Sequence, residues 1–393
     1  MIKPQADALE KEIAQMRETI LEKKRKLDSV LDLFRNASTY AVEESLGGTV
    51  QNYQYFVYPF KGVTLVDQSL YKILAKYLAK MVSKDTEVLL TVEADGIGIA
   101  TLLAAELGLP LIICKSFHYN IPCVEFVQET GYYKRSMHMP KIIQGKRVAI
   151  VDCLISTGGT IKNMIEKAIG LAGTTITGVY CVNNKSNYQE NKDSKSAFAG
   201  YPYRYLFDTK INEKQEVESS MSDHLKRVFW RDIDVKFYQI AEKFLELSSS
   251  SKHGYRVGCV LVDMTTFEIT AWGYRRGHVH AEQDALSMLR ENFPDWQSRK
   301  YSIYSTMEPC SARNGSGFKP CAHLIGEIPQ IKWVVIGEKD TMDGKINGNG
   351  IKYLLEKGKN VRVFKTDEVF LAENHASAPE SPIPNLVPAF CAV

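Results

Sequence analysis

The chain has 393 residues, 45% of them hydrophobic and 24% charged, and its 49 basic and 46 acidic side chains leave a net charge of +3. A charge so near balance gives no electrostatic basis for binding nucleic acid or a membrane surface. The eight cysteines are irregularly spaced, the apolar runs are too short to cross a bilayer, and the N-terminus has no apolar signal region. These features predict a soluble, cytoplasmic protein of two or three domains.

Residues 8–35 are predicted to form one long helix, followed by a break near residue 38. Its apolar residues follow a heptad-like spacing, interrupted at Lys23: Leu9, Ile13, Met16, Ile20, Leu27, Val30 and Phe34. One interpretation is a coiled coil, in which residues 1–38 pair with a partner helix and the protein is a homo-oligomer, a dimer or tetramer. The other is an amphipathic helix that packs on its own domain.

From residue 40 to 212, short apolar strands alternate with amphipathic helices. The expected strands are 87–92, 111–114, 147–151 and 175–182, and the expected helices are 70–82, 97–107 and 160–171. This alternation predicts an α/β domain with a mainly parallel sheet covered on both faces. The polar residues 183–200 are expected to form a surface loop, and the Glu- and Ser-rich residues 211–222 the domain boundary.

A second α/β domain is predicted over residues 223–368. It begins with a helix, and its expected strands are 257–262, 268–273, 301–305, 332–336 and 361–364. Residues 369–393 carry four prolines without an apolar pattern, so they are expected to form a tail.

Three short motifs in the second domain predict a zinc site. They are His280-Ala281-Glu282, Glu308-Pro309-Cys310 and Pro320-Cys321. One imidazole and two thiolates supply three ligands of a tetrahedral zinc ion and leave the fourth position for water. Glu282 would move the proton of that water to a leaving amine, as in zinc nucleobase deaminases. The alternatives are buried thiols or a structural zinc site, for which His323 is near enough in sequence to be a fourth ligand.

Further segments around these motifs resemble the riboflavin-pathway pyrimidine deaminases of the cytidine deaminase superfamily, most closely their fungal branch. The segments are 255–262, 273–274, 280–283, 308–319, 334–337 and 348–351. The resemblance implies an α/β/α sandwich with His280, Cys310 and Cys321 on Zn²⁺ and Glu282 as the proton carrier. Ten residues separate the two cysteines, which favours this subgroup over deaminases that edit nucleic acid. Residues 253–255 replace the family's Asn-Pro pair and the loop before His280 is short, so the exact substrate is left open.

The first domain contains a predicted phosphate-binding turn. An apolar strand ending in Asp152 leads into a Ser/Thr/Gly turn that opens a helix: Ser156, Thr157, Gly158, Gly159 and Thr160. Backbone N–H groups, hydroxyls and a helix N-terminus together favour an anion. An ordinary strand–turn–helix corner is the alternative.

This turn resembles the phosphoribosyl-pyrophosphate motif of type I phosphoribosyltransferases, particularly the adenine and xanthine enzymes. A second segment matches the family's pyrophosphate loop: Glu93, Ala94, Asp95 and Gly96. The resemblance implies that Asp152 binds ribose hydroxyls, that residues 156–160 bind the 5′-phosphate, and that Mg²⁺ accompanies phosphoribosyl pyrophosphate. Residues 125–139 lie where the family has its mobile loop. Cys153 replaces the second of two adjacent acids, which leaves open whether this domain transfers or only binds a phosphoribosyl group.

Taken together, the sequence predicts a zinc-dependent hydrolytic deaminase of a free, phosphorylated pyrimidine nucleotide or a riboflavin-type aminopyrimidine. The first domain would make or bind the phosphoribosylated substrate. One alternative is a nucleotide-sensing domain that gates the deaminase. The other is a nucleic-acid base deaminase, which the balanced charge disfavours.

Overall fold

The computed structural model describes residues 3–42, 53–131, 133–188, 200–248, 256–312, 317, 319–340 and 349–372. The chain divides into two compact units, and the division falls within helices α1 (Lys3–Arg35) and α6 (Asp223–Lys243). Residues 23–229 are called the Asp152 unit here, and residues 1–22 together with 230–393 the His280 unit. No helix in the described ranges is both long and apolar enough to cross a bilayer.

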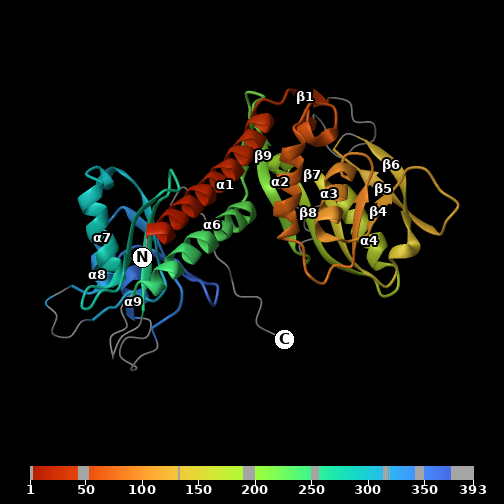
Figure 1. Ribbon diagram of the computed structural model, residues 1–393. Helices are drawn as coiled ribbons and strands as arrows, with labels where there is room; N and C mark the ends of the chain where they lie inside the picture. The colour runs from red at the N-terminus through yellow and green to blue at the C-terminus, as the bar shows by residue number, and fades with distance from the viewer. Residues whose placement is uncertain are drawn as a thin grey trace. The chain divides into compact units, whose positions relative to one another are not determined.

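The Asp152 unit is built on a six-stranded sheet with the order β10-β9-β8-β7-β3-β4, in which only β10 is antiparallel. Figure 1 labels four of these strands, β4, β7, β8 and β9. Its strands are β3 (Val88–Val92), β4 (Leu111–Cys114), β7 (Arg147–Ile155), β8 (Thr175–Lys185), β9 (Tyr203–Ile211) and β10 (Val217–Met221). Its helices are α2 (Gln68–Ala79), α3 (Ile97–Leu107) and α4 (Gly159–Ile169), with short 3-10 helices η1 (Pro59–Lys61), η2 (Lys141–Ile143) and η3 (Ser186–Tyr188). The parallel strands bring their carboxyl ends to one edge of the sheet, where ligand sites of such folds form.

Alternating side chains of the strands meet helices on both faces of this sheet. Val88, Leu90 and Val92 of β3 share a buried core with Ile161 and Met164 of α4. The intervening residues of β3 face the other way, where α3 contacts β3 and packs against α2. The predicted α/β architecture is therefore confirmed for this unit.

Three hairpins were not expected from the sequence. Residues 217–221 form the edge strand β10 on β9, although 211–222 were predicted to be a boundary segment. Only Val217 of β10 is fully buried, because an edge strand with one polar face needs few apolar residues. The hairpin of β5 (Cys123–Glu129) and β6 (Lys134–Pro140) occupies the expected loop 125–139. The third hairpin pairs β1 (Thr39–Val42) with β2 (Tyr53–Phe56).

The segment 183–200 also differs from the expected surface loop. Residues 183–185 are buried and extend β8, and they hydrogen-bond to neighbouring groups such as Asp208 and Thr209 of β9. Buried polar residues of this kind hide a strand from a hydropathy pattern. Residues 189–199 lie outside the described residues.

The apolar seam of α1 is buried in its second half, whereas Leu9, Ile13 and Met16 in its first half are only half-buried. In the Asp152 unit, Leu27, Val30 and Phe34 are completely buried. The Phe34 ring lies 5.4–5.9 Å from the rings of three residues of the same unit, namely Tyr58, Phe60 and Phe207. In the His280 unit, Arg17 Nε donates to the carbonyl of Thr266 at 3.0 Å. For residues 27–34 the structure therefore favours the amphipathic-helix interpretation, and the homo-oligomer stays a prediction.

The His280 unit has a second six-stranded sheet, with the order β12-β11-β13-β14-β15-β16. Its strands are β11 (Gly258–Asp263), β12 (Ile269–Tyr274), β13 (Tyr301–Ser305), β14 (Ile331–Ile336), β15 (Asn360–Val363) and β16 (Glu368–Phe370). Its further helices are α7 (Ala281–Asn292), α8 (Cys321–Gly326) and α9 (Asn349–Glu356), with η4 (Phe244–Glu246) and η5 (Trp296–Ser298). Strands β13, β14 and β15 are parallel.

Helices cover both faces of this sheet, as the predicted α/β/α sandwich requires. Side chains of α7, α8 and α9 share one core with Ile303 and Val334. On the other face, Phe237 of α6 packs its ring 5.4 Å from that of Tyr304, and Asp234 pairs with Arg362 at 2.6 Å. Residues 373–393, most of the predicted tail, lie outside the described residues.

Candidate phosphate-binding and metal sites

The carboxyl edge of the first sheet holds a cavity of about 280 Å³. Strands β3 and β7 are parallel neighbours, so the two loops that follow them meet there. The cavity is lined by nine of the ten residues predicted for phosphoribosyl and pyrophosphate binding: Glu93, Ala94, Asp95, Gly96, Asp152, Ser156, Thr157, Gly158 and Thr160. Gly159, the tenth, is the first residue of α4. The structure thus brings together two segments that are far apart in the sequence.

The turn at residues 156–160 has the backbone of an anion cradle. Gly158 caps α4 with a φ of 85°, which a residue with a side chain rarely adopts. A Cβ on Gly159 would lie 3.1 Å from the carbonyl oxygen of Glu129, so this glycine lets the β5–β6 hairpin approach. The Thr160 hydroxyl donates to the same carbonyl at 2.8 Å. Thr157, Gly158 and Thr160 line the cavity at the N-terminus of α4, and the N–H groups of the first turn of a helix favour an anion.

The loop at residues 93–96 is held by hydrogen bonds to one carbonyl, that of Glu93, and it contains Gly96 at a close approach. Arg135 and Gln128, from the β5–β6 hairpin, donate to the Glu93 carbonyl at 2.8 and 3.2 Å. A Cβ on Gly96 would lie 2.4 Å from Thr91 Oγ1 and 3.1 Å from Asp152 Oδ1. The loop can therefore approach Asp152 only because residue 96 is a glycine.

Asp152 lines the cavity beside Gly96. Burial raises the pKa of the Asp152 carboxyl to about 7, and the carboxylate of Asp95 adds to the rise. The hydrogen bond that Asp152 accepts from the Cys153 N–H at 2.7 Å acts in the other direction and lowers this pKa. Cys153 is 1% exposed, and burial raises the pKa of its thiol far above the ordinary value. Cys153 therefore supplies no negative charge to the cavity.

Further residues line this cavity. Gln128, Tyr133 and Arg135 belong to the segment 125–139 that was matched to the family's mobile loop, whereas no pattern in the sequence pointed to Tyr53 and Tyr55 of β2 or Lys61 of η1. The Tyr53 hydroxyl donates to Ser156 Oγ at 2.8 Å, and Lys61 Nζ lies 2.8 Å from Asp95 Oδ2. Only the folded chain places these residues near the phosphate-binding turn.

In the His280 unit, the three predicted zinc ligands converge. His280 precedes α7, Cys321 is the first residue of α8, and Cys310 follows β13. His280 Nδ1 lies 3.5 Å from each of the two sulfur atoms, and the three ligand atoms all lie within 4.8 Å of one another. Zinc–sulfur bonds of ~2.3 Å and zinc–nitrogen bonds of ~2.0–2.1 Å at a tetrahedral angle place S and N about 3.6 Å apart, so these residues fit the ion.

The charge state of Cys310 also suits a metal ion. The hydrogen bond between Cys310 and Cys321 and the nearby His280 lower the pKa of Cys310 to about 4, although burial opposes the change. A thiolate is the form of cysteine that binds zinc. His323 is not part of the cluster, because its ring stacks 4.0 Å from that of Tyr353. Among the residues that the structure describes, no fourth protein ligand joins the three.

Glu282 lies beside this cluster and is almost completely buried, with 3% of its surface exposed. Its Oε1 accepts a hydrogen bond from the Ser305 hydroxyl at 2.8 Å. Burial raises its pKa, and the charge of Cys310 adds to the rise. Glu282 is not one of the three converging residues. Its carboxylate therefore lies near the cluster of His280, Cys310 and Cys321 but is not a predicted ligand of the metal.

A second buried glutamate, Glu308, belongs to one of the predicted zinc motifs, but the sequence assigned it no role. Its Oε1 accepts the backbone N–H of Ile351 at 3.1 Å, and its Oε2 accepts that of Asp340 at 3.0 Å. Glu308 therefore ties the turn that carries Cys310 to α9 and to the segment after β14.

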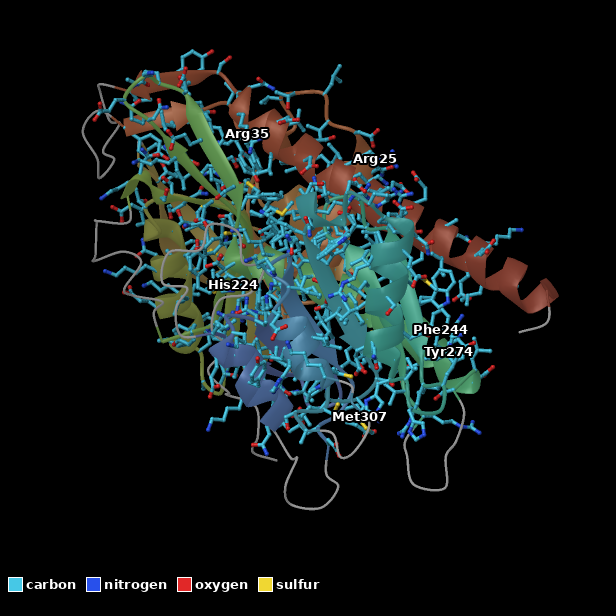
Figure 2. The ribbon with its side chains drawn as sticks, turned by 90° about the vertical axis from the view of Figure 1, so that its left-hand side faces the viewer. Arg25, Arg35, His224, Phe244, Tyr274 and Met307 are labelled. Carbon is cyan, nitrogen blue, oxygen red and sulfur yellow. The ribbon has the colours of Figure 1, made fainter. Side chains whose placement is uncertain are left out.

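On the strand before His280, Tyr274 (Figure 2) packs its ring 4.7 Å from the guanidinium of Arg276. Arg276 in turn forms a two-point ion pair with Asp284 at 2.6 and 2.7 Å.

Models of two known families match this chain, one in each of its two units. The family model "Phosphoribosyl transferase domain" matches residues 64–204, and "Cytidine and deoxycytidylate deaminase zinc-binding region" matches residues 231–338. A hypoxanthine/guanine phosphoribosyltransferase of Methanosarcina acetivorans is 38% identical over 132 residues, which cover 33% of this chain and 69% of that protein.

Two solved structures are also similar to parts of the chain. The Rib2 deaminase of Aspergillus oryzae is 27% identical, with 33% of this chain and 83% of that chain covered and a TM-score of 0.29. An adenine phosphoribosyltransferase of Thermoanaerobacter pseudethanolicus is 19% identical, with 44% and 95% covered and a TM-score of 0.36.

Proposed function

We propose that this chain, which belongs to the phosphoribosyltransferase family, is a zinc-dependent deaminase of a small-molecule nucleotide. It also carries the zinc-binding region of the cytidine and deoxycytidylate deaminases. Its substrate is a free phosphorylated pyrimidine nucleotide or a riboflavin-type aminopyrimidine. The Asp152 unit, assigned to residues 40–212, makes or binds the phosphoribosylated substrate. The deaminase domain is assigned to residues 223–368, and the protein to the cytoplasm.

The observation that carries this proposal is the buried Glu282 beside the cluster of His280, Cys310 and Cys321. These three residues would hold Zn²⁺, which supplies Lewis-acid activation of water when it is bound. The Ser305 hydroxyl orients the Glu282 carboxylate through Oε1. The raised pKa of Glu282 suits a group that takes a proton from water and gives it to a leaving amine, which departs as ammonia.

We assign binding roles to the residues of the Asp152 unit in the same way. Asp152 binds the ribose hydroxyls, and residues 156–160 bind the 5′-phosphate through N–H and hydroxyl donors. Transfer of a phosphoribosyl group would also need pyrophosphate at residues 93–96 together with Mg²⁺. The carboxylates of Asp95 and Asp152 are oxygen donors of the kind that Mg²⁺ prefers. The name of the Methanosarcina relative supports a phosphoribosyl group in this unit.

The first experiment is ammonia release by the zinc-loaded chain across nucleoside 5′-monophosphates, their nucleosides and free bases, and phosphorylated and unphosphorylated aminopyrimidines. Turnover of a 5′-phosphorylated pyrimidine but not of its free base is the expected result. Deamination of single-stranded oligonucleotides, with no turnover of free nucleotides, would instead establish the nucleic-acid alternative.

A regulatory role of the Asp152 unit is the second candidate, because the neutral Cys153 replaces an acid in its ribose-binding segment. In that case a nucleotide that binds the Asp152 unit changes the rate of ammonia release without being consumed. Equal rates with and without a bound but unreactive nucleotide would count against gating.

A further inference from the structure

A buried tyrosine of β2 contacts the phosphate-binding turn. Tyr53 is 4% exposed and lines the cavity, and its hydroxyl donates to Ser156 Oγ at 2.8 Å. The two residues are 103 positions apart in the chain, so only the fold brings them together. Ser156 is the first residue of the segment 156–160, to which the proposed function assigns the 5′-phosphate. The contact therefore reaches the anion site from a strand outside the turn.

This hydrogen bond restricts what the Ser156 hydroxyl can do. A serine hydroxyl has one proton to donate and two lone pairs that accept. Because Ser156 Oγ accepts the proton of Tyr53, its own proton is left for a different partner. Ser156 donates to no carbonyl or side chain within the described ranges, and it lines the cavity. Its proton is therefore available to an oxygen of a ligand in the cavity.

An ionised phosphate is the kind of group that suits such a hydroxyl. Its oxygens accept hydrogen bonds and have no proton to donate, and bonds to an ionised acceptor are stronger than neutral ones. Hydrogen bonds in a chain also strengthen one another. The Tyr53 hydroxyl therefore makes Ser156 a better donor to phosphate than an isolated serine would be.

The Tyr53 ring is held by two further segments of the Asp152 unit. Lys185, at the end of β8, is 1% exposed, and its Nζ lies 4.2 Å from the centre of the ring, within the range of a cation–π interaction. The same ammonium group donates to the carbonyl of Gln54, the next residue of β2. A Cβ on Gly131, between β5 and β6, would lie 2.0 Å from Cδ2 and Cε2 of the ring. These contacts keep the ring, and with it the hydroxyl, in place beside Ser156.

We propose that Tyr53 is a positioning residue of the phosphate site, which directs the proton of the Ser156 hydroxyl to an ionised phosphate oxygen. The inference rests on the proposed function, in which residues 156–160 bind the 5′-phosphate. Tyr53 acts through Ser156, so its hydroxyl strengthens the binding of a phosphorylated ligand only while Ser156 is present.

A double-mutant cycle of Tyr53→Phe and Ser156→Ala tests this inference, because phenylalanine removes the hydroxyl and keeps the ring. Calorimetry of the full, zinc-loaded chain measures the affinity for ribose 5-phosphate, and thermal unfolding shows whether each variant is folded. The matched control is Tyr40→Phe. It removes a hydroxyl from β1 of the same hairpin, at an exposed position outside the cavity.

Tyr53→Phe is expected to weaken the binding of ribose 5-phosphate about threefold to tenfold with little change in Tm, and Tyr40→Phe to leave the affinity unchanged. Ser156→Ala should lose at least as much, and the double variant should bind no more weakly than Ser156→Ala. Unchanged affinity in Tyr53→Phe, or losses that add in the double variant, would overturn the inference and leave the phosphate site in place.

A wild type that does not bind ribose 5-phosphate would overturn the inference together with this unit's part in the proposed function. Ammonia release in the same samples tests the deaminase separately, because His280, Cys310 and Cys321 belong to the other unit.

Discussion

The two buried glutamates of the His280 unit make different contacts, so the same substitution should have different effects on them. Glu282 accepts a hydrogen bond from the Ser305 hydroxyl, and an amide oxygen at this position can still accept it. Glu282→Gln therefore keeps the fold and removes only the group that carries the proton. General acid–base catalysis contributes about 10²–10⁴ in rate. We expect kcat for ammonia release to fall by that factor, equivalent to about 3–5 kcal/mol of transition-state stabilisation.

Glu308→Gln is the matched control. Both carboxylate oxygens of Glu308 accept backbone N–H groups, at 3.1 and 3.0 Å, so Glu308 has no role in moving a proton. The amide oxygen of the glutamine can still accept one of these two hydrogen bonds, but its NH₂ group would face the second backbone N–H, which is also a donor. Losing one hydrogen bond to a charged, buried acceptor costs about 1.5–3 kcal/mol, which lowers Tm by several degrees.

The assay combines ammonia release, zinc content and thermal unfolding of the wild type and both variants, at a temperature where all three are folded. Glu282→Gln should hold a full complement of zinc, unfold no earlier than the wild type and be nearly inactive. Glu308→Gln should unfold earlier and retain most of its activity. The reasoning is refuted if Glu282→Gln retains activity within about threefold of the wild type, or if folded, zinc-loaded Glu308→Gln is as inactive as Glu282→Gln is expected to be.

Three further predictions follow from the described contacts. Removal of zinc with a chelator should abolish ammonia release and lower Tm, because three ligand atoms within 4.8 Å lose their shared ion, and zinc but not magnesium should restore both. Gly96→Ala should weaken nucleotide binding at least about tenfold in calorimetry, because its Cβ would displace Thr91 or Asp152; unchanged binding would contradict the position of the loop. Burial and neighbouring arginines lower the pKa of His224 (Figure 2) from 6.5 to about 4. Between these pH values the unfolded chain binds more protons than the folded chain. The free energy of unfolding should therefore fall as the pH drops from about 6.5 toward 4. His224→Gln should flatten this part of the Tm–pH curve, whereas the exposed control His118→Gln should leave it as in the wild type.

Most regular elements near the sites could be predicted from periodicity. The helix at 97–107 and the strands at 111–114 and 301–305 have the predicted bounds, because their apolar runs and flanking residues are local signals. The edge strand β10 and the β5–β6 hairpin could not be predicted in this way. Their polar faces are stabilised by pairing with another strand, which a local pattern does not contain.

The amino-acid sequence by itself determined which residue types the zinc cluster and the phosphate-binding turn contain, since His-x-Glu, Pro-Cys and Ser-Thr-Gly-Gly-Thr are short motifs whose chemistry is local. Only the tertiary structure decided what surrounds them. It placed Lys61 on Asp95, 34 residues further along the chain, and placed Glu308 on backbone groups 32 and 43 residues away. It also buried Leu27, Val30 and Phe34 of α1. The physical reason is that charge pairing and burial depend on distances through space, which are set by how the sheets and helices pack.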